Sequence, residues 1–246
     1  MPYSDFAEPA QRLMTPEPHS TDILGQPFSN ITVALDWLSL SHMINELVKQ
    51  TTGQDVFGDA AMALSGDWES VWRSAGALRN LAAAFQDIGS NVTKGNLELD
   101  GDWDGNAADA AFVYFSDLGS ALSEQYGPLM RLAEAYETAA EGTYRLQEGV
   151  SGILKDLMDS AAIAVIAASA GTAAIETGVG FVTGWAIAAY EAHRIIELTN
   201  DARKLIATAS ALVNGISGTI QSAAADVNVM VEQLPGAPYA HPGEAR

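Results

Sequence analysis

Apolar residues recur every three or four positions over most of this chain, and prolines leave that stretch almost intact. Between Pro27 and Pro235 one proline, Pro128, interrupts the sequence. Proline breaks helices because it lacks an amide hydrogen and because its ring clashes with the preceding turn. Helical periodicity over so long a segment therefore predicts an all-α fold, in the form of an elongated helical bundle.

Two amphipathic helices are predicted to form an antiparallel hairpin over residues 65–158. The first helix follows Ser65, and its apolar positions average about 3.5 residues apart, which is typical of a seam against a partner helix. These positions are Trp68, Val71, Trp72, Ala75, Leu78, Ala82, Phe85, Ile88 and Val92. The second helix carries a similar seam from about residue 106 to 158, and Pro128 is predicted to interrupt or kink it.

Differences in composition along the chain predict how the rest of it is organised. Prolines cluster near both ends, which predicts solvated, flexible termini outside the core. A short helix is predicted within residues 30–49. The predicted organisation is a flexible N-terminal arm (1–28), N-terminal helices with the hairpin (29–158), an Ala/Gly-rich hairpin with an amphipathic helix (159–234) and a flexible tail (235–246).

Residues 160–190 hold one charged residue, Glu176, and are rich in Ala and Gly. A membrane-crossing helix needs about 20 apolar residues, and the uncharged runs on either side of Glu176 are shorter. We therefore expect a buried helical hairpin packed through small residues, with Glu176 at a turn or in solvent. A membrane-active or pore-forming protein that uses this segment is the alternative.

The last amphipathic segment runs from Tyr190 to Leu234. It is predicted to form one helix, or a pair broken near Gly215 and Gly218. Its apolar residues can cover the part of the second hairpin helix that extends beyond the first. This intramolecular cover predicts a folded monomer, with a homo-oligomer as the alternative.

Charge and side-chain chemistry exclude several classes of function. A net charge of -19 repels phosphate backbones, so no nucleic-acid partner is expected. The absence of cysteine excludes disulfides and thiolate metal sites. The histidines lack ligand spacing, and no nucleophile elbow or phosphate-binding loop occurs. We therefore predict a protein that is not an enzyme and that carries no cofactor or metal.

An acidic turn joins the two seam-bearing helices at Leu99-Asp100-Gly101-Asp102-Trp103-Asp104-Gly105-Asn106. Its aspartates match the first half of an EF-hand calcium loop, but the ninth and twelfth loop positions are Ala108 and Ala111. A calcium cage needs a bidentate carboxylate at the twelfth position. A solvated acidic turn is therefore the favoured interpretation.

The tripeptide Trp103-Asp104-Gly105 in this turn resembles the motif of the WXG (Trp-x-Gly) family, whose members are antiparallel helical hairpins with Trp-x-Gly at the bend. The flanking segments Ser65-Gly-Asp-Trp-Glu, Ala77-Leu-Arg-Asn and Gly105-Asn-Ala-Ala-Asp-Ala-Ala-Phe resemble long actinobacterial members. The resemblance covers roughly residues 60–215. The helices added after the hairpin depart from the minimal family pattern.

The resemblance implies a type VII (ESX) secretion substrate, or an effector or translocation domain, that acts through helix–helix recognition. It implies export without a Sec signal peptide, to the medium or the cell surface. Trp103 and Gly105 are then the recognition residues, and Tyr144 and Glu148 match a Tyr-x-x-x-Asp/Glu element of the family. The implied partners are the secretion machinery and a small WXG protein. A seam role for Tyr144, with Glu148 in solvent, and a purely structural bundle remain the alternatives.

Overall fold

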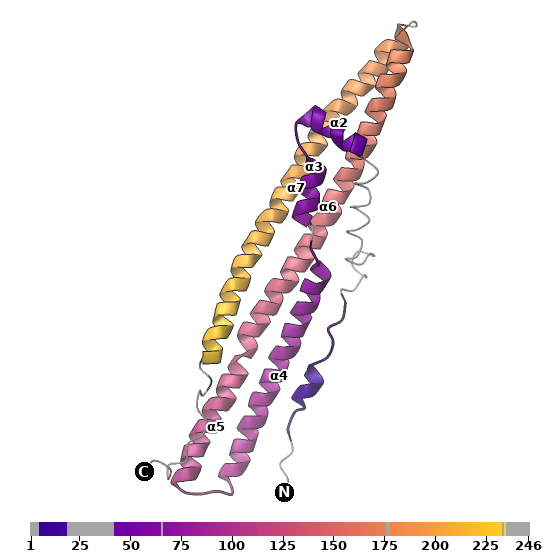
Figure 1. The fold of residues 1–246 in the computed structure, drawn as a ribbon. Helices are drawn as coiled ribbons and strands as arrows, with labels where there is room; N and C mark the ends of the chain where they lie inside the picture. Colours follow the sequence, from indigo (N-terminus) through magenta and orange to yellow (C-terminus); the bar gives the residue numbers. More distant parts are fainter. Residues whose placement is uncertain (1–4, 19–41, 65, 176–177, 233, 235–246) are drawn as a thin grey trace. The chain divides into compact units, whose positions relative to one another are not determined.

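The chain is helical in the part that the structure describes, which confirms the predicted all-α class. The computed structural model describes residues 5–18, 42–64, 66–175, 178–232 and 234, and no strand occurs among them. The elements are η1 (Pro9–Arg12, a 3₁₀ helix), α2 (His42–Thr52), α3 (Val56–Leu64), α4 (Trp68–Asp100), α5 (Asn106–Glu124), α6 (Tyr126–Ala173) and α7 (Val179–Glu232) (Figure 1). None of the helices in these ranges is long and apolar enough to cross a membrane.

Segments far apart in the sequence assemble into two compact units. Unit 1 consists of Met1–His19, Ser70–Ala139 and Gly215–Arg246, and unit 2 of Ser20–Glu69 and Ala140–Asn214. The division differs from the boundary expected near residue 158, because α6 passes that position without a break. The short helix expected within residues 30–49 lies partly outside the described residues, and α2 ends at Thr52.

In unit 1, α4 packs on α5 near the bend and on the first part of α6 further from it, and this face of α4 is built from small residues. Ala75, Ala82 and Gly89 recur every seventh position and are buried. A Cβ atom on Gly89 would lie 2.6 Å from the carbonyl oxygen of Gly119, so the two backbones touch there. Two turns further, Asn96 Nδ2 donates to the carbonyl oxygen of Phe112 at 2.9 Å and to Ser116 Oγ at 3.0 Å.

The predicted seam of α4 is therefore correct in period but only partly correct in its residues. Ala75 and Ala82 lie in the helix interface, as predicted, whereas Ile88 is 37% exposed. Small residues occupy the interface because they let the two backbones approach closely. Ile88 is left on an outer face of α4, whereas larger residues such as Leu78 and Phe85 are half-buried.

The predicted second hairpin helix is two helices. α5 ends at Glu124 and α6 begins at Tyr126, with Gln125 between them. Pro128 explains the break, because a proline ring clashes with the carbonyl group four residues earlier, which belongs to Glu124. Beyond the break, α6 extends past the predicted end at residue 158 to Ala173.

The C-terminal part of α7 completes unit 1. Ile216 and Ala223 are buried, and Arg131 Nη2 of α6 lies 2.9 Å from Asp226 Oδ2 of α7. Gly215 and Gly218 lie inside α7, which therefore forms one helix and not a broken pair.

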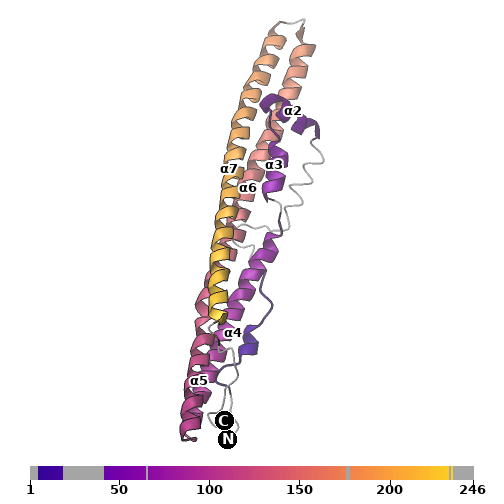
Figure 2. The same cartoon turned by 60° about the vertical axis from the view of Figure 1, so that its left-hand side comes forward.

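Unit 2 is centred on the antiparallel pairing of α6 with α7, which α2 and α3 cover on one side (Figure 2). Leu157 of α6, Ile195 of α7 and Phe57 of α3 belong to its main apolar cluster. Further along, Ala60, Val150 and Ala209 form a second cluster. This arrangement confirms that the last amphipathic segment covers the distal stripe of the preceding helix.

The α6–α7 hairpin differs from the buried hairpin expected for residues 160–190. Its inner positions are small and buried, as expected, but its large apolar side chains point outward. Ile166 is 69% exposed and Val182 is 64% exposed. Glu176, which was expected at a turn or in solvent, lies outside the described residues.

Candidate recognition site at the hairpin bend

The bend between α4 and α5 depends on a glycine conformation. α4 ends at Asp100, and the turn closes with Asp102 N donating to the carbonyl oxygen of Leu99 at 3.1 Å. Gly105 then has φ 104° and ψ 175°, a region open essentially to glycine. Its carbonyl oxygen accepts from Asp109 N at 3.0 Å, which begins the ladder of α5.

Trp103 lies in this bend, where the resemblance to WXG hairpins implies it. Its side chain remains 37% exposed. Asp100, Asp102 and Asp104 beside it are also exposed. The bend therefore presents an aromatic surface, surrounded by carboxylates, that a partner can reach.

The aspartates of the bend do not form a metal cage. Among the described residues, no group of three or more histidine and acidic side chains is arranged to hold a metal ion. Ala108 and Ala111, at the positions where an EF-hand has its later ligands, are buried in α5.

A groove of about 980 Å³ runs from the bend along α4. Its apolar floor consists of Ile88, Val92 and Leu99 of α4 with Phe115 of α5, and Glu98 and Asp102 add carboxylates to its lining. The floor exists because small residues fill the α4–α5 interface and leave larger ones outside. The groove was not predicted from the sequence, because Ile88 and Val92 were assigned to the hairpin seam.

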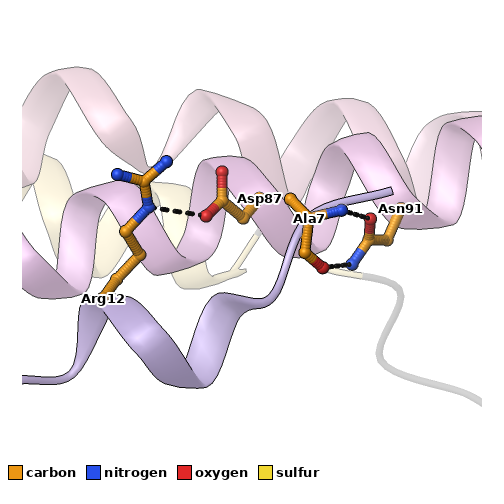
Figure 3. A network of polar contacts seen from close by, with 4 residues as sticks. All are labelled: Ala7, Arg12, Asp87 and Asn91. Atoms are coloured by element: carbon orange, nitrogen blue, oxygen red, sulfur yellow. Dashed lines mark hydrogen bonds and ion pairs between the residues drawn. The ribbon is translucent and has the colours of Figure 1, made fainter. Parts of the chain in front are cut away.

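The N-terminal segment 5–18, which we call the strap, lies along α4 and adds Asp5 and Pro9 to the groove. The Asn91 side chain pairs with the Ala7 backbone: Ala7 N donates to Asn91 Oδ1 at 2.9 Å, and Asn91 Nδ2 donates to Ala7 O at 2.8 Å (Figure 3). Arg12 Nε lies 2.8 Å from Asp87 Oδ2, in the same view.

Further contacts continue along the strap. Lys94 Nζ lies 5.1 Å from the centre of the Phe6 ring, a cation–π contact, and Asn80 Nδ2 donates to Met14 O at 2.9 Å. This docking differs from the solvated arm predicted for residues 1–28, of which 1–4 and 19–28 lie outside the described residues. Most of residues 5–18 are exposed, but their contacts with α4 were not predicted, because side-chain pairing with a distant backbone leaves no periodic signal.

Tyr144 and Glu148 lie on α6 in unit 2, whereas the bend belongs to unit 1. Tyr144 is 4% exposed, and Glu148 is exposed. Burial raises the pKa of Tyr144, and the charge of Glu148 raises it further. The structure thus favours a core position for Tyr144, with Glu148 in solvent.

His193 is a surface residue of α7. His193 Nε2 lies 3.4 Å from Glu197 Oε1, and both side chains are largely exposed. His19 and His241 lie outside the described residues. No family model, no curated protein and no solved structure matches the chain.

Proposed function

We propose that this chain is a substrate of a type VII secretion system, or an effector or translocation domain of one, and that it acts by helix recognition and not by catalysis. The observation that carries the proposal is the bend itself. Trp103 and Gly105 join α4 to α5, and Trp103 is exposed at the turn. This is the placement that the resemblance to WXG hairpins implies.

The groove beside the bend supports recognition of a helical partner. Ile88, Val92 and Leu99 follow the spacing of a helix seam and line the groove, where Ile88 and Leu99 are exposed. A partner helix laid along them would complete a stripe that this chain leaves partly open. The proposed partners are a component of the secretion machinery and a small WXG protein.

The Tyr144–Glu148 element gives the proposal less support than the bend does. Recognition of the Tyr144 ring would require α6 and its neighbours to separate, because that ring is buried. We therefore assign recognition to Trp103 and Gly105 and give Tyr144 a packing role.

Replacing Trp103 with Ala tests the proposal. We expect Trp103→Ala to lower export at least tenfold while the purified protein keeps its helical circular dichroism and its midpoint of thermal unfolding within a few degrees. The matched control is Trp185→Ala, which removes another exposed tryptophan, on α7. That variant should be exported like the unchanged protein.

Two outcomes would overturn the assignment. If Trp103→Ala unfolds the protein, Trp103 is a structural plug of the hairpin. If both tryptophan variants are exported normally, the bend is not read by the export machinery.

A further inference from the structure

The residues of α4 that line the groove include a set with the spacing of a coiled-coil seam. They are separated by four, three and four positions, the alternation of a heptad repeat, and they are Ile88, Val92, Gly95 and Leu99. The same alternation continues toward the start of α4 with Phe85 and Leu81. We call these residues the outer seam of α4.

The outer seam lies on a different face of α4 from the interface with α5. Successive residues of an α-helix are rotated by about 100°, so Ile88 is turned away from Gly89, which touches α5. Leu81, Ile88 and Leu99 are exposed. The described part of unit 1 therefore leaves this second apolar face of α4 partly open.

The strap and α5 border the outer seam at the groove. Asp5 and Pro9 of the strap line the groove, and so does Phe115 of α5. Hydrogen bonds to Asp87 and Asn91 hold the strap on α4 (Figure 3). The floor from residue 88 to residue 99 is about 16 Å long, or three helical turns. This length and the heptad spacing suit one amphipathic helix.

The charge of the groove comes from carboxylates. Asp5, Glu98 and Asp102 line it, and no lysine or arginine occurs among the described residues of its lining. Lys94 lies outside the lining, with its Nζ atom 3.8 Å from Glu98 Oε1 and 5.1 Å from the centre of the Phe6 ring. The groove is therefore complementary to a surface that combines apolar and basic side chains.

A second copy of the chain fits the groove less well than such a surface does. The outer seam of that copy is bordered by the same three carboxylates, and its net charge is also -19. Like charges placed across an interface reduce affinity. Charge complementarity therefore favours a different protein as the occupant.

We propose that the groove binds an amphipathic helix of another protein, which packs an apolar stripe on the outer seam and places lysine or arginine residues opposite Asp5, Glu98 and Asp102. This inference deepens the proposed function and rests on it, because it specifies the chemistry of the helix that the groove receives. The bend and the groove use different side chains, so the two can be tested separately.

The first test compares two synthetic helical peptides of about 18 residues, or five turns. Both carry the same leucine heptad stripe, and the positions beside the stripe are lysine in one peptide and glutamate in the other. We expect fluorescence anisotropy with the full chain to show at least tenfold tighter binding of the lysine peptide at low salt. The difference should shrink in about 1 M NaCl, where the Debye length is about 3 Å.

Two double variants locate the peptide on the outer seam. Ile88→Ser/Leu99→Ser should weaken binding of the lysine peptide at least tenfold. The matched control is Leu97→Ser/Val113→Ser, at positions that are also exposed but do not line the groove, and it should bind like the unchanged protein. Because all of these positions are exposed, the circular dichroism should stay the same in both variants.

Two triple variants test the carboxylates at constant net charge. Asp5→Asn/Glu98→Gln/Asp102→Asn should remove most of the preference for the lysine peptide. The control neutralises exposed carboxylates of α5 and α6 outside the groove and should keep the preference; it is Asp117→Asn/Glu124→Gln/Glu134→Gln.

Three results would overturn the inference: equal binding of the two peptides by the folded, unchanged protein, no binding of either, or equal loss of preference in both triple variants. A dimer in sedimentation that Ile88→Ser/Leu99→Ser dissociates would also overturn it, because the groove is then an interface between copies. Export of Trp103→Ala remains the separate test of the proposed function. Normal export of that variant would refute recognition of the bend, whereas selective peptide binding would still support the groove.

Discussion

Single residues decide the geometry of the hairpin bend and the position of the strap. Gly105 holds a backbone conformation that side chains exclude, and Trp103 is presented two residues before it. On α4, the Asn91 side chain accepts from the backbone N–H of Ala7 and donates to the backbone C=O of the same residue. Both devices depend on one residue type, so each can be tested by one substitution and a nearby control.

Replacing Gly105 with Ala should destabilise the protein through the backbone. No atom lies within 4 Å of the added Cβ, so the effect comes from the φ of 104° and not from a clash. We expect a loss of about 1–3 kcal/mol in the free energy of unfolding. Gly101→Ala is the control in the same bend, since its Cβ would lie 3.5 Å from the Glu98 carbonyl oxygen, an ordinary contact. Equal unfolding midpoints in urea for the two variants would contradict this account.

Replacing Asn91 with Ala should release the strap. The substitution removes two hydrogen bonds to Ala7, together worth about 1–2 kcal/mol, which corresponds to roughly a five- to thirtyfold larger released population. Trypsin cleavage after Arg12 should accelerate by a similar factor. Gln86→Ala, at an exposed position of α4, should leave the rate unchanged. A strap cleaved at the same rate in all three proteins would show that Asn91 does not hold it.

At the scale of elements, small residues set which faces of the long helices meet. Along α7, Ala188, Ile195, Ala202 and Ala209 recur every seventh residue and are buried. A parallel series contains Gly184, Leu198, Leu205 and Leu212, and Glu191 occupies the position between Gly184 and Leu198. Glu191 is 6% exposed, and its Oε2 atom has no hydrogen-bond partner in the described residues.

Replacing Glu191 with Leu should stabilise the α6–α7 pair. The change removes a buried, incompletely bonded carboxylate and continues the leucine series, which predicts a gain of about 1–3 kcal/mol. Glu197→Leu, at an exposed position of the same helix, should change stability by about 0.5 kcal/mol or less. Urea unfolding measures both variants. A destabilised Glu191→Leu variant would mean that the carboxylate has a structural partner.

The same features explain how far the sequence could predict the elements. Period and proline position were sufficient for the helical class, whereas the bend at Trp103 and Gly105 was predicted from the acidic turn between two seam-bearing helices and from the resemblance to WXG hairpins. They could not decide which of two faces of α4 is the interface, because Ala75, Ala82 and Gly89 share their seven-residue repeat with the larger residues beside them. The end of α6 at Ala173 was missed because an Ala/Gly-rich segment carries no stop signal near residue 158.

The strap and the groove could not be predicted from the sequence, for a different reason. Both depend on contacts between residues far apart in the chain, such as Asn91 with Ala7 and Arg12 with Asp87. A proline-rich segment with few apolar residues predicts solvation, and most of the strap is exposed; its position along α4 depends on facing side chains that the sequence of the strap does not reveal.

At the scale of the whole molecule, an acidic, all-α chain is proposed to be recognised at one exposed bend. This bend belongs to unit 1, whereas Trp185, the position of the control variant, belongs to unit 2. Trp103→Ala and Trp185→Ala therefore distinguish recognition of the bend from a general effect of losing an exposed tryptophan.

Export itself is the measurement that tests the proposed function most directly. The cell that makes this protein should release it to the medium or carry it on its surface when the type VII ATPase is intact. Inactivating that ATPase should leave the folded protein in the cytoplasm, while a Sec-exported protein of the same cell still leaves normally. Release at the same level with and without the ATPase, or retention in the cytoplasm in both strains, would contradict the account.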